Sequence, residues 1–289
     1  RAAAVPGHLA LWTGLYSASA LLCLVQTTGV PADVFSRRAV AGYLCAWATA
    51  TSVYLLDRVK LSDRRLDPAD AQAKPERYAF LHSRRCAIRA AAAVLALIGL
   101  VCGWLVHPLC VALVLGAFVG ILIYAGHPPG HVSGRRRRLK DLFIIKNLSV
   151  AGSITAFAAG IALLAAYSDR RPNSAGPSLN AAEFLGGALL LLGRVAADAA
   201  LCDIDDEAAD RRYGTQTLPT RLGRERTWLI ALGLGAVLVG ASWLLPAPAP
   251  GRSARILWTG LALVSGVGIR MWNPGRLRDV IDFRFVAIG

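Results

Sequence analysis

The stretch with the clearest capacity for chemistry is Asp203–Pro219, which reads DIDDEAADRRYGTQTLP. Five of the chain's 18 acidic residues fall within eight positions here, directly after a run of leucine and alanine long enough to cross a bilayer. If a helix continues past that run, Asp203, Asp206 and Asp210 have the spacing i, i+3, i+7 and lie on one helix face. Like charges at this spacing repel each other, so some positive charge must offset them.

Two sources of that positive charge are compatible with the sequence. The acids can form a solvated helix end, which Arg211 and Arg212 would neutralise. Alternatively, they hold a divalent cation, because Mg²⁺ binds through one or two carboxylates and completes its shell with water and phosphate oxygens. Ionisable groups at the ends of membrane helices mark function by default, which favours the metal.

A second acidic cluster follows the apolar run that ends near Leu56. Its members are Asp57, Asp63, Asp67, Asp70 and Glu76. Both clusters lie in segments expected on the same side of the membrane, so their carboxylates can face each other across a helix bundle. Two such acidic walls could hold a diphosphate through bridging metal ions.

Other polar side chains are expected near the same level of the membrane. Lys146 either extends to the lipid headgroups or contacts a phosphate as a point charge, and Asn147 is next to it. Tyr124 ends an apolar run, where an interfacial tyrosine is common. Arg194 and Asp198 have the spacing i, i+4 within one run, and we expect them to neutralise each other.

The elements that must position these residues are apolar helices. Of the 289 residues, 55% are hydrophobic and 17% are charged, which is typical of a polytopic membrane protein. The sequence predicts eight spans, at Leu9–Val30, Ala39–Leu56, Ala87–Val106, Leu109–Ala125, Leu142–Tyr167, Ala182–Leu201, Leu229–Leu245 and Ile256–Met271. A ninth span is expected to begin at Val280 and to be truncated at Gly289. We therefore predict an all-α, polytopic membrane helix bundle of about nine transmembrane helices, formed by residues 1–289 as a single domain.

The net charge of +14 is distributed in a way that argues against nucleic acid as a partner. Most of the 32 Lys and Arg residues lie at the N-terminus, in the loops after spans two, four and six, or after span eight. This alternation predicts that the N-terminus and those loops face the cytoplasm, with the acidic clusters on that side. The Arg135–Arg138 run then acts as a topology anchor near anionic headgroups. The six cysteines have no metal-ligand spacing and are expected to act as small hydrophobic residues.

Together these motifs resemble the UbiA superfamily of intramembrane prenyltransferases. The stretch DIDDEAADRRYGTQTLPTRLG is similar to the family's second aspartate motif, with Asp203, Asp206 and Asp210 on the acidic positions. The trailing part of the motif matches Gly214, Thr217, Leu218, Pro219 and Gly223. The family's middle segment resembles Tyr124 to Pro128 followed by Lys140 and by Lys146-Asn147.

The first aspartate motif departs from the family pattern. In SVYLLDRVKLSDRRLDPAD, Asp57 with Arg58 matches the middle aspartate and the neighbouring arginine. Val53 and Tyr54, however, stand where the family has Asn and Asp. Asp63 and Asp67 form a shifted pair that either replaces the missing ligands or solvates the loop.

The resemblance implies Mg²⁺-dependent transfer of a prenyl group from a prenyl diphosphate to a lipophilic, aromatic acceptor within the membrane. It implies that the metal is held by Asp57, Asp63, Asp203, Asp206 and Asp210. Substrate would be bound by Lys146, Asn147, Tyr124 and Arg58, and catalysis would depend on Asp57, Asp206, Asp210 and Lys146. The expected location is a cell inner (plasma) membrane or an organelle membrane.

Two other functions compete with the enzyme. The altered first motif favours a UbiA-like protein that has lost catalysis and binds an isoprenoid lipid. A transporter would need acids or broken helices near the middle of the membrane. Only Asp198 comes close to that position, and it has a ready partner in Arg194.

Overall fold

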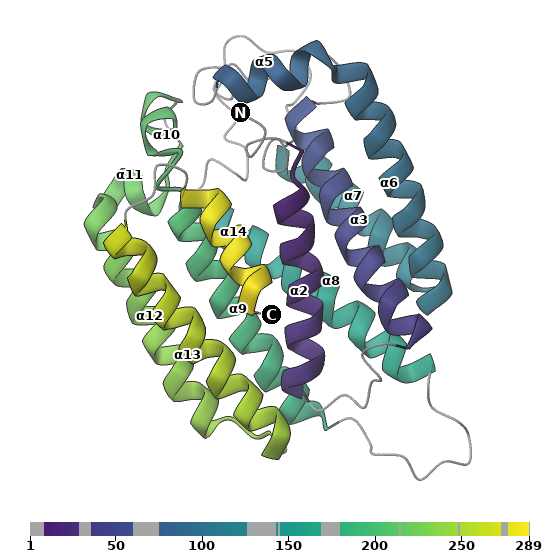
Figure 1. Cartoon of the computed structure of the whole chain (residues 1–289), viewed down its shortest axis with the longest axis vertical. Coiled ribbons are helices and arrows are strands. Elements are labelled where there is room, and N and C mark those ends of the chain that lie inside the picture. The colour runs from purple at the N-terminus through teal and green to yellow at the C-terminus, as the bar shows by residue number, and fades with distance from the viewer. Residues whose placement is uncertain are drawn as a thin grey trace.

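A computed structural model of the chain describes residues 9–28, 36–59, 75–125, 143, 145–168, 180–213, 215–247, 249–272 and 277–288. Every regular element among them is a helix (Figure 1). The helices are α2 (Leu11–Thr28), α3 (Arg37–Val59), α5 (Pro75–Ser83), α6 (Arg85–Val106), α7 (Cys110–Ala125), α8 (Ile145–Ser168), α9 (Ala181–Cys202), α10 (Glu207–Tyr213), α11 (Leu218–Leu222), α12 (Arg224–Leu244), α13 (Ala249–Trp272) and α14 (Leu277–Ile288). Several residues singled out in the sequence lie outside the described ranges: Asp63, Asp67, Asp70, Pro128, Arg135–Arg138, Lys140 and Gly214.

The predicted all-α membrane bundle is confirmed. Each of the eight predicted apolar runs lies on one long helix, and α14 contains the start of the ninth. Within the described ranges, six helices are long and apolar enough to cross a membrane: α3, α6, α8, α9, α12 and residues 251–272 of α13. The apolar part of α7, Cys110–Tyr124, is shorter. The count of nine spans stays a prediction.

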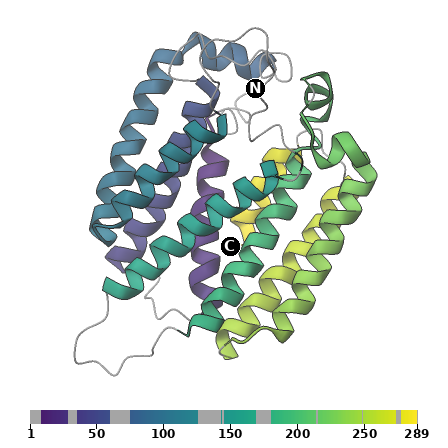
Figure 2. The ribbon, with the colours of Figure 1, turned by 180° about the vertical axis from the view of Figure 1, so that it is seen from behind.

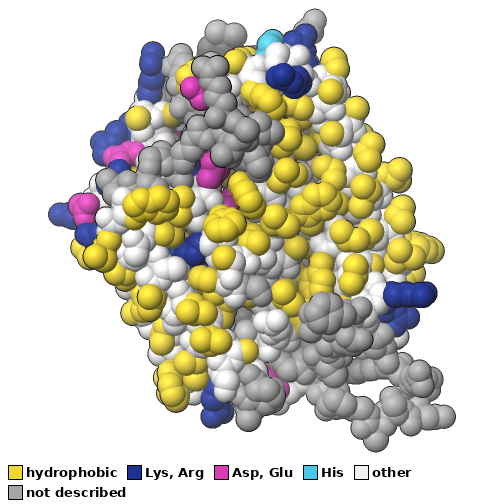
Figure 3. Space-filling view, in the orientation of Figure 1, with side chains coloured by type: hydrophobic (Ala, Val, Ile, Leu, Met, Phe, Trp, Pro, Cys, Tyr) yellow, Lys and Arg dark blue, Asp and Glu magenta, His cyan; other side chains and the backbone are white. Residues whose placement is uncertain are grey.

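The outer surface of the bundle suits a lipid environment. In Figure 3, hydrophobic side chains cover much of the visible face, and most of the Lys and Arg side chains lie toward its two ends. Large apolar residues stand exposed along several helices, among them Val94, Trp104, Leu122, Val237 and Val264. A soluble monomer rarely exposes an apolar surface of this extent, whereas a bilayer solvates it.

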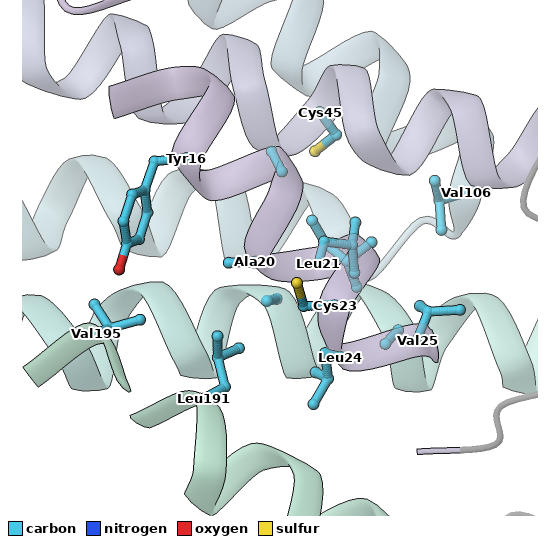
Figure 4. Packing of buried hydrophobic residues seen from close by; sticks show 14 of the residues in the cluster. Tyr16, Ala20, Leu21, Cys23, Leu24, Val25, Cys45, Val106, Leu191 and Val195 are labelled. Carbon is cyan, nitrogen blue, oxygen red and sulfur yellow. The ribbon is translucent and has the colours of Figure 1, made fainter. Parts of the chain in front are cut away.

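Helix α2 lies at the centre of the bundle and organises the others around it. It contacts α3, α8, α9, α13 and α14, with α3 and α6 on one side of it and α12 and α13 on the other (Figures 1 and 2). Its Leu21 and Leu24 are almost fully buried, and side chains such as Leu191 of α9 and Cys45 of α3 pack around it (Figure 4). Because α2 is enclosed, polar side chains on it must find partners inside the protein.

A buried arginine ties the helices together at the end of α2. Arg255 of α13 is fully buried, and its guanidinium donates to the carbonyl oxygens of Thr27 (2.7 Å), Pro246 (2.8 Å) and Glu183. These carbonyls belong to the last turn of α2, the connection between α12 and α13, and the first turn of α9. One side chain therefore joins α2, α9 and the α12–α13 connection, and at Thr27 it satisfies a carbonyl that the end of α2 leaves unpaired.

The expectation that a single helix carries Asp203, Asp206 and Asp210 is wrong. Helix α9 ends at Cys202, residues 203–206 form a turn, and α10 begins at Glu207. The turn is held by backbone hydrogen bonds from Asp206 N to Asp203 O (3.2 Å) and from Asp210 N to Asp206 O (2.8 Å). The three carboxylates would repel each other on one continuous helix face, and in the structure each of them meets a cation from another helix.

Close contact between α2 and α3 generates a testable expectation at Gly14. A Cβ atom at this position would lie 2.0 Å from Thr51 Oγ1 and 2.9 Å from the carbonyl oxygen of Trp47. We expect Gly14→Ala to destabilise the protein by roughly 1–3 kcal/mol, because the two helices must separate. Thermal unfolding in detergent measures the effect.

Gly233→Ala is the matched control for this substitution. It makes the same change on α12, where nothing lies within 4 Å of the added Cβ. The control should be neutral or stabilising by up to about 1 kcal/mol, because alanine favours helix more than glycine does. Equal melting temperatures for Gly14→Ala and the wild type would disprove the close packing.

Candidate active site

A cavity of about 890 Å³ opens between α2, α3, α7, α8, α9, α10 and α14. Eight of the nine residues predicted for the site line it, from four different helices and the turn after α9: Asp57, Arg58, Tyr124, Lys146, Asn147, Asp203, Asp206 and Asp210. The ninth, Asp63, lies outside the described residues. We call the part of the cavity bounded by Asp57, Asp203, Asp206 and Asp210 the acidic end.

Lys146 joins two of the carboxylates at the acidic end. Its Nζ lies 2.7 Å from Asp203 Oδ1 and 3.4 Å from Asp210 Oδ2. The Asp203 side chain is only 3% exposed, while the Lys146 and Asp210 side chains retain 18% and 14% exposure. Carboxylate oxygens of Asp203 in the turn and of Asp210 on α10 thus converge on the Lys146 ammonium, although Asp203 and Asp210 are seven positions apart.

Asn147 supports the same carboxylate from the next position of α8. In the amide orientation that satisfies its neighbours, the side chain donates to Asp203 Oδ2 (2.9 Å) and accepts from the backbone N–H of Ala200 (3.3 Å). Lys146 and Asn147 therefore hold one oxygen each of Asp203. This explains physically why a lysine and an asparagine occur together in the first turn of an apolar helix.

Asp206 is held by a helix that the sequence analysis did not connect with the site. Arg278, at the start of α14, donates from Nη2 to Asp206 Oδ2 (2.8 Å), and its backbone N–H donates to Asp205 Oδ2 (2.9 Å). Arg278 and Asp282 of α14 both line the cavity. The available signal was the sequence LRDVIDFRF, in which four charged residues interrupt an apolar run.

The wall opposite the turn comes from α3 and α7. Asp57 and Arg58 line the cavity one turn beyond Val53 and Tyr54, the two residues that depart from the family pattern. Tyr124 of α7 lies close enough to interact electrostatically with both Asp57 and Asp203. Among the described residues of α3, Asp57 is the only acid, so this wall carries less negative charge than the turn after α9.

Away from the acidic end, the cavity continues as an apolar arm between α3, α7 and α8. Gly116, Gly120 and Gly152 line this arm, and open space surrounds the position where each would carry a Cβ. Leu113 and Phe157 line it further along the same helices. An arm without charge, next to a charged end, fits a molecule with an apolar tail and an ionic head.

The motif that follows the acids builds the connection from α10 to α11. The Thr215 backbone N–H donates to Asp210 O (2.9 Å), and Thr215 lines the cavity. Thr217 caps α11, where its backbone N–H donates to the Thr220 hydroxyl (2.8 Å). Gly223 then adopts φ 83°, a conformation that glycine takes without strain, and so the chain can turn directly into α12. These residues hold Asp210 in place rather than contacting a ligand.

The acidic end carries more negative charge than its own side chains neutralise. Of the described residues that line the acidic end, four are aspartates and three are basic (Arg58, Lys146 and Arg278). Burial raises the pKa of the Asp210 carboxyl to about 6, and the Lys146 ammonium offsets part of this effect. Burial raises the pKa of the Asp203 carboxyl as well, again against the influence of Lys146. Both shifts mean that an additional cation would stabilise the ionised carboxylates.

The carboxylates at the acidic end are the possible ligands for a magnesium ion. No three His, Cys, Asp or Glu side chains of the described residues converge into a complete metal site. Mg²⁺ needs only one or two carboxylates when phosphate and water complete its shell. Asp203 and Asp210 already share one cation through Lys146 Nζ, so the residues present fit a metal that is shared with a diphosphate ligand.

Lys146 provides a direct test of this arrangement. We expect Lys146→Met to destabilise the metal-free protein by roughly 3–5 kcal/mol, because a buried carboxylate loses its cation. The melting temperature in EDTA should fall by on the order of ten degrees, and added Mg²⁺ should restore more of it than in the wild type.

Adding Asp203→Asn to Lys146→Met supplies the control, because it removes the charge that was left unpaired. The double variant should recover much of the lost stability in EDTA. If the melting temperature of Lys146→Met in EDTA equals that of the wild type, Lys146 does not hold these carboxylates.

Comparison with known proteins shows which family and which fold this chain resembles. A model of the UbiA prenyltransferase family matches residues 10–280. A sequence comparison with curated proteins gives no significant match. The fold is similar to an apo UbiA homologue from Aeropyrum pernix K1, with a TM-score of 0.60 and 15% identity over 96% of this chain and 97% of that chain.

Two further solved structures resemble this one. A UbiA homologue from Archaeoglobus fulgidus bound to DMAPP and Mg²⁺ has a TM-score of 0.58 and 14% identity, over 97% of this chain and 96% of that chain. A structure of digeranylgeranylglyceryl phosphate synthase has a TM-score of 0.50 and 14% identity, over 97% of this chain and 92% of that chain. At these identities the structures support the fold alone, and the family match over residues 10–280 is what shows that the chain belongs to the UbiA prenyltransferase family.

Proposed function

We propose that this protein transfers a prenyl group from a prenyl diphosphate to a lipophilic, aromatic acceptor within the membrane, and that the transfer depends on Mg²⁺. The observation that carries this proposal is the junction of an acidic end with an apolar arm in one cavity. The diphosphate would lie at the acidic end and the prenyl tail in the arm beside Gly116 and Gly120. Family membership and the presence of DMAPP and Mg²⁺ in a structure of similar fold support the same assignment.

The charge balance supports a requirement for divalent cations. A diphosphate brings several negative charges to an end that already has a surplus of carboxylates. In this proposal the metal is held by Asp203, Asp206 and Asp210, with Asp57 on the opposite wall and Asp63 as a further candidate. Bound Mg²⁺ would supply positive charge against the diphosphate oxygens.

The chain's own cations would act on the leaving group. Lys146 and Arg278 now neutralise Asp203, Asp210 and Asp206. Because a bound metal would replace that positive charge, both side chains would become available to the pyrophosphate, which departs with the electrons of the broken C–O bond. Asn147, Tyr124 and Arg58 line the same end and would position the head group.

The apolar arm would protect the reaction. Breaking the C–O bond leaves an allylic cation, which the acceptor ring attacks to form the new C–C bond before the ring loses a proton. Water would quench that cation, and an arm lined by Gly116, Leu113 and Phe157 excludes water. The distribution of Lys and Arg supports a cytoplasmic orientation of the acidic end, in a cell inner or organelle membrane, with residues 1–289 acting as one domain.

The first test uses isothermal titration calorimetry to measure the binding of a non-hydrolysable geranylgeranyl thiodiphosphate to the detergent-purified protein. We expect binding in Mg²⁺ that EDTA abolishes. Asp206→Asn should weaken it by on the order of 10–100-fold, because a ligand of the metal is lost. Glu225→Gln is the matched control: it removes one acid from an exposed pair with Arg270, outside the cavity, and should bind as the wild type does.

A measurement of turnover distinguishes an enzyme from a non-catalytic, lipid-binding protein. The second function is favoured by the presence of a single acidic residue on α3. Release of pyrophosphate from geranylgeranyl diphosphate should require a lipophilic phenol. The mass of the prenylated product should exceed that of the phenol by the mass of the prenyl group minus one hydrogen. Release in the wild type should fall to background in Asp206→Asn. Metal-dependent binding without product from any phenol would favour the non-catalytic function, and binding that ignores EDTA would remove the metal role from Asp206.

A further inference from the structure

The cavity has a second polar wall, set apart from the acidic end and formed by α2, α9 and α14. Thr13 and Tyr16 of α2, Asp198 of α9 and Asp282 of α14 all line it. Two aspartates therefore face the cavity here in addition to those at the acidic end. Their hydrogen-bonding states differ, and that difference indicates what the wall can bind.

Asp198 is fully occupied by protein groups. Its Oδ1 contacts Arg194 Nη2 at 2.9 Å and also Arg284 Nη2, and its Oδ2 accepts from the Tyr16 hydroxyl at 3.0 Å. The residue is 2% exposed. The predicted pair of Arg194 with Asp198 is therefore present, with Arg284 as a second cation. We assign this group a structural role in joining α2, α9 and α14.

Asp282 has spare capacity for a ligand. Its Oδ2 accepts from the Thr13 hydroxyl at 3.1 Å. Within the described part of the chain, no other hydrogen-bond donor reaches this carboxylate, and the residue is only half-buried. Arg278 of the same helix and Arg58 of α3 lie close enough to interact electrostatically with Asp282. Arg278 donates its hydrogen bonds to the turn after α9 instead. A carboxylate that faces a cavity inside a membrane bundle with spare hydrogen-bonding capacity marks a functional position.

Asp282 also lies at a suitable distance from the proposed diphosphate. It follows Arg278 by four residues on α14, so the two lie on one helix face, separated by about 6 Å along the axis. Arg278 contacts Asp206 at the acidic end. A group bound at Asp282 would therefore lie one helical turn below the proposed diphosphate, beside the first carbons of the prenyl chain.

We propose that Asp282 binds a hydroxyl group of the acceptor, so that the acceptor is a neutral phenol or quinol rather than a carboxylate. This inference rests on the proposed function. An ionised carboxylate accepts a strong hydrogen bond from an O–H donor. The same charge repels an acceptor carboxylate, at an energy that the low dielectric of the cavity increases. The hydrogen bond also raises the electron density of the aromatic ring, which favours attack on an allylic cation.

The test compares two bicyclic probes that differ only in their polar group, 2-naphthol and 2-naphthoate. Binding is measured by calorimetry on the purified protein, with and without Mg²⁺ and the thiodiphosphate. We expect 2-naphthol to bind roughly tenfold or more tightly than 2-naphthoate, as a hydrogen bond to a charged group implies. Asp282→Asn should remove most of this preference while binding of the thiodiphosphate is retained.

Asp279→Asn is the matched control, since it removes the same charge from the same helix at a position that does not line the cavity. It should preserve the preference for 2-naphthol. Equal or tighter binding of 2-naphthoate to the wild type would overturn the proposal, and this comparison is decisive even if Asp282→Asn does not fold. Failure of the proposed function would show separately, as absent metal-dependent binding of the thiodiphosphate.

Discussion

Carboxylates at the end of a membrane helix are stable only where cations offset their charge, and the architecture of this site follows from that constraint. Lys146 of α8 meets Asp203 and Asp210, while Arg278 of α14 meets Asp206. Helices that are far apart in the sequence are thereby drawn to one end of one cavity. Helix α9 ends at Cys202, directly before the first of these carboxylates, and the turn that follows presents them to Lys146 and Arg278.

The arrangement links stability to ligand binding. In the absence of ligand, the basic side chains neutralise the acids and keep the end of the bundle together. A metal with a diphosphate would substitute for those cations and leave them to bind the phosphates.

Central placement of α2 explains how two polar regions coexist in one apolar bundle. Its apolar side chains, such as Leu21 and Leu24, anchor it among the surrounding helices. Two of its polar side chains contact α9 and α14, where Tyr16 meets Asp198 and Thr13 meets Asp282. The cavity therefore has an ionic end, an apolar arm and a separate hydrogen-bonding wall, which are the three environments that a prenyl diphosphate and a hydroxylated ring would need.

The sequence by itself determined the helices and the chemistry of the acidic turn. Long apolar runs bounded by charges leave the backbone no alternative to helix in a bilayer, and clustered acids require a cation. Only the tertiary structure decided which cation meets which carboxylate, because partners such as Arg278 and Asp206 lie 72 residues apart in the sequence. The tertiary structure also places Arg278 and Asp282 in the cavity wall. It pairs Asp198 with both Arg194 and Arg284. Such contacts depend on how helices rotate and cross, and packing fixes these features without leaving a local pattern in the sequence.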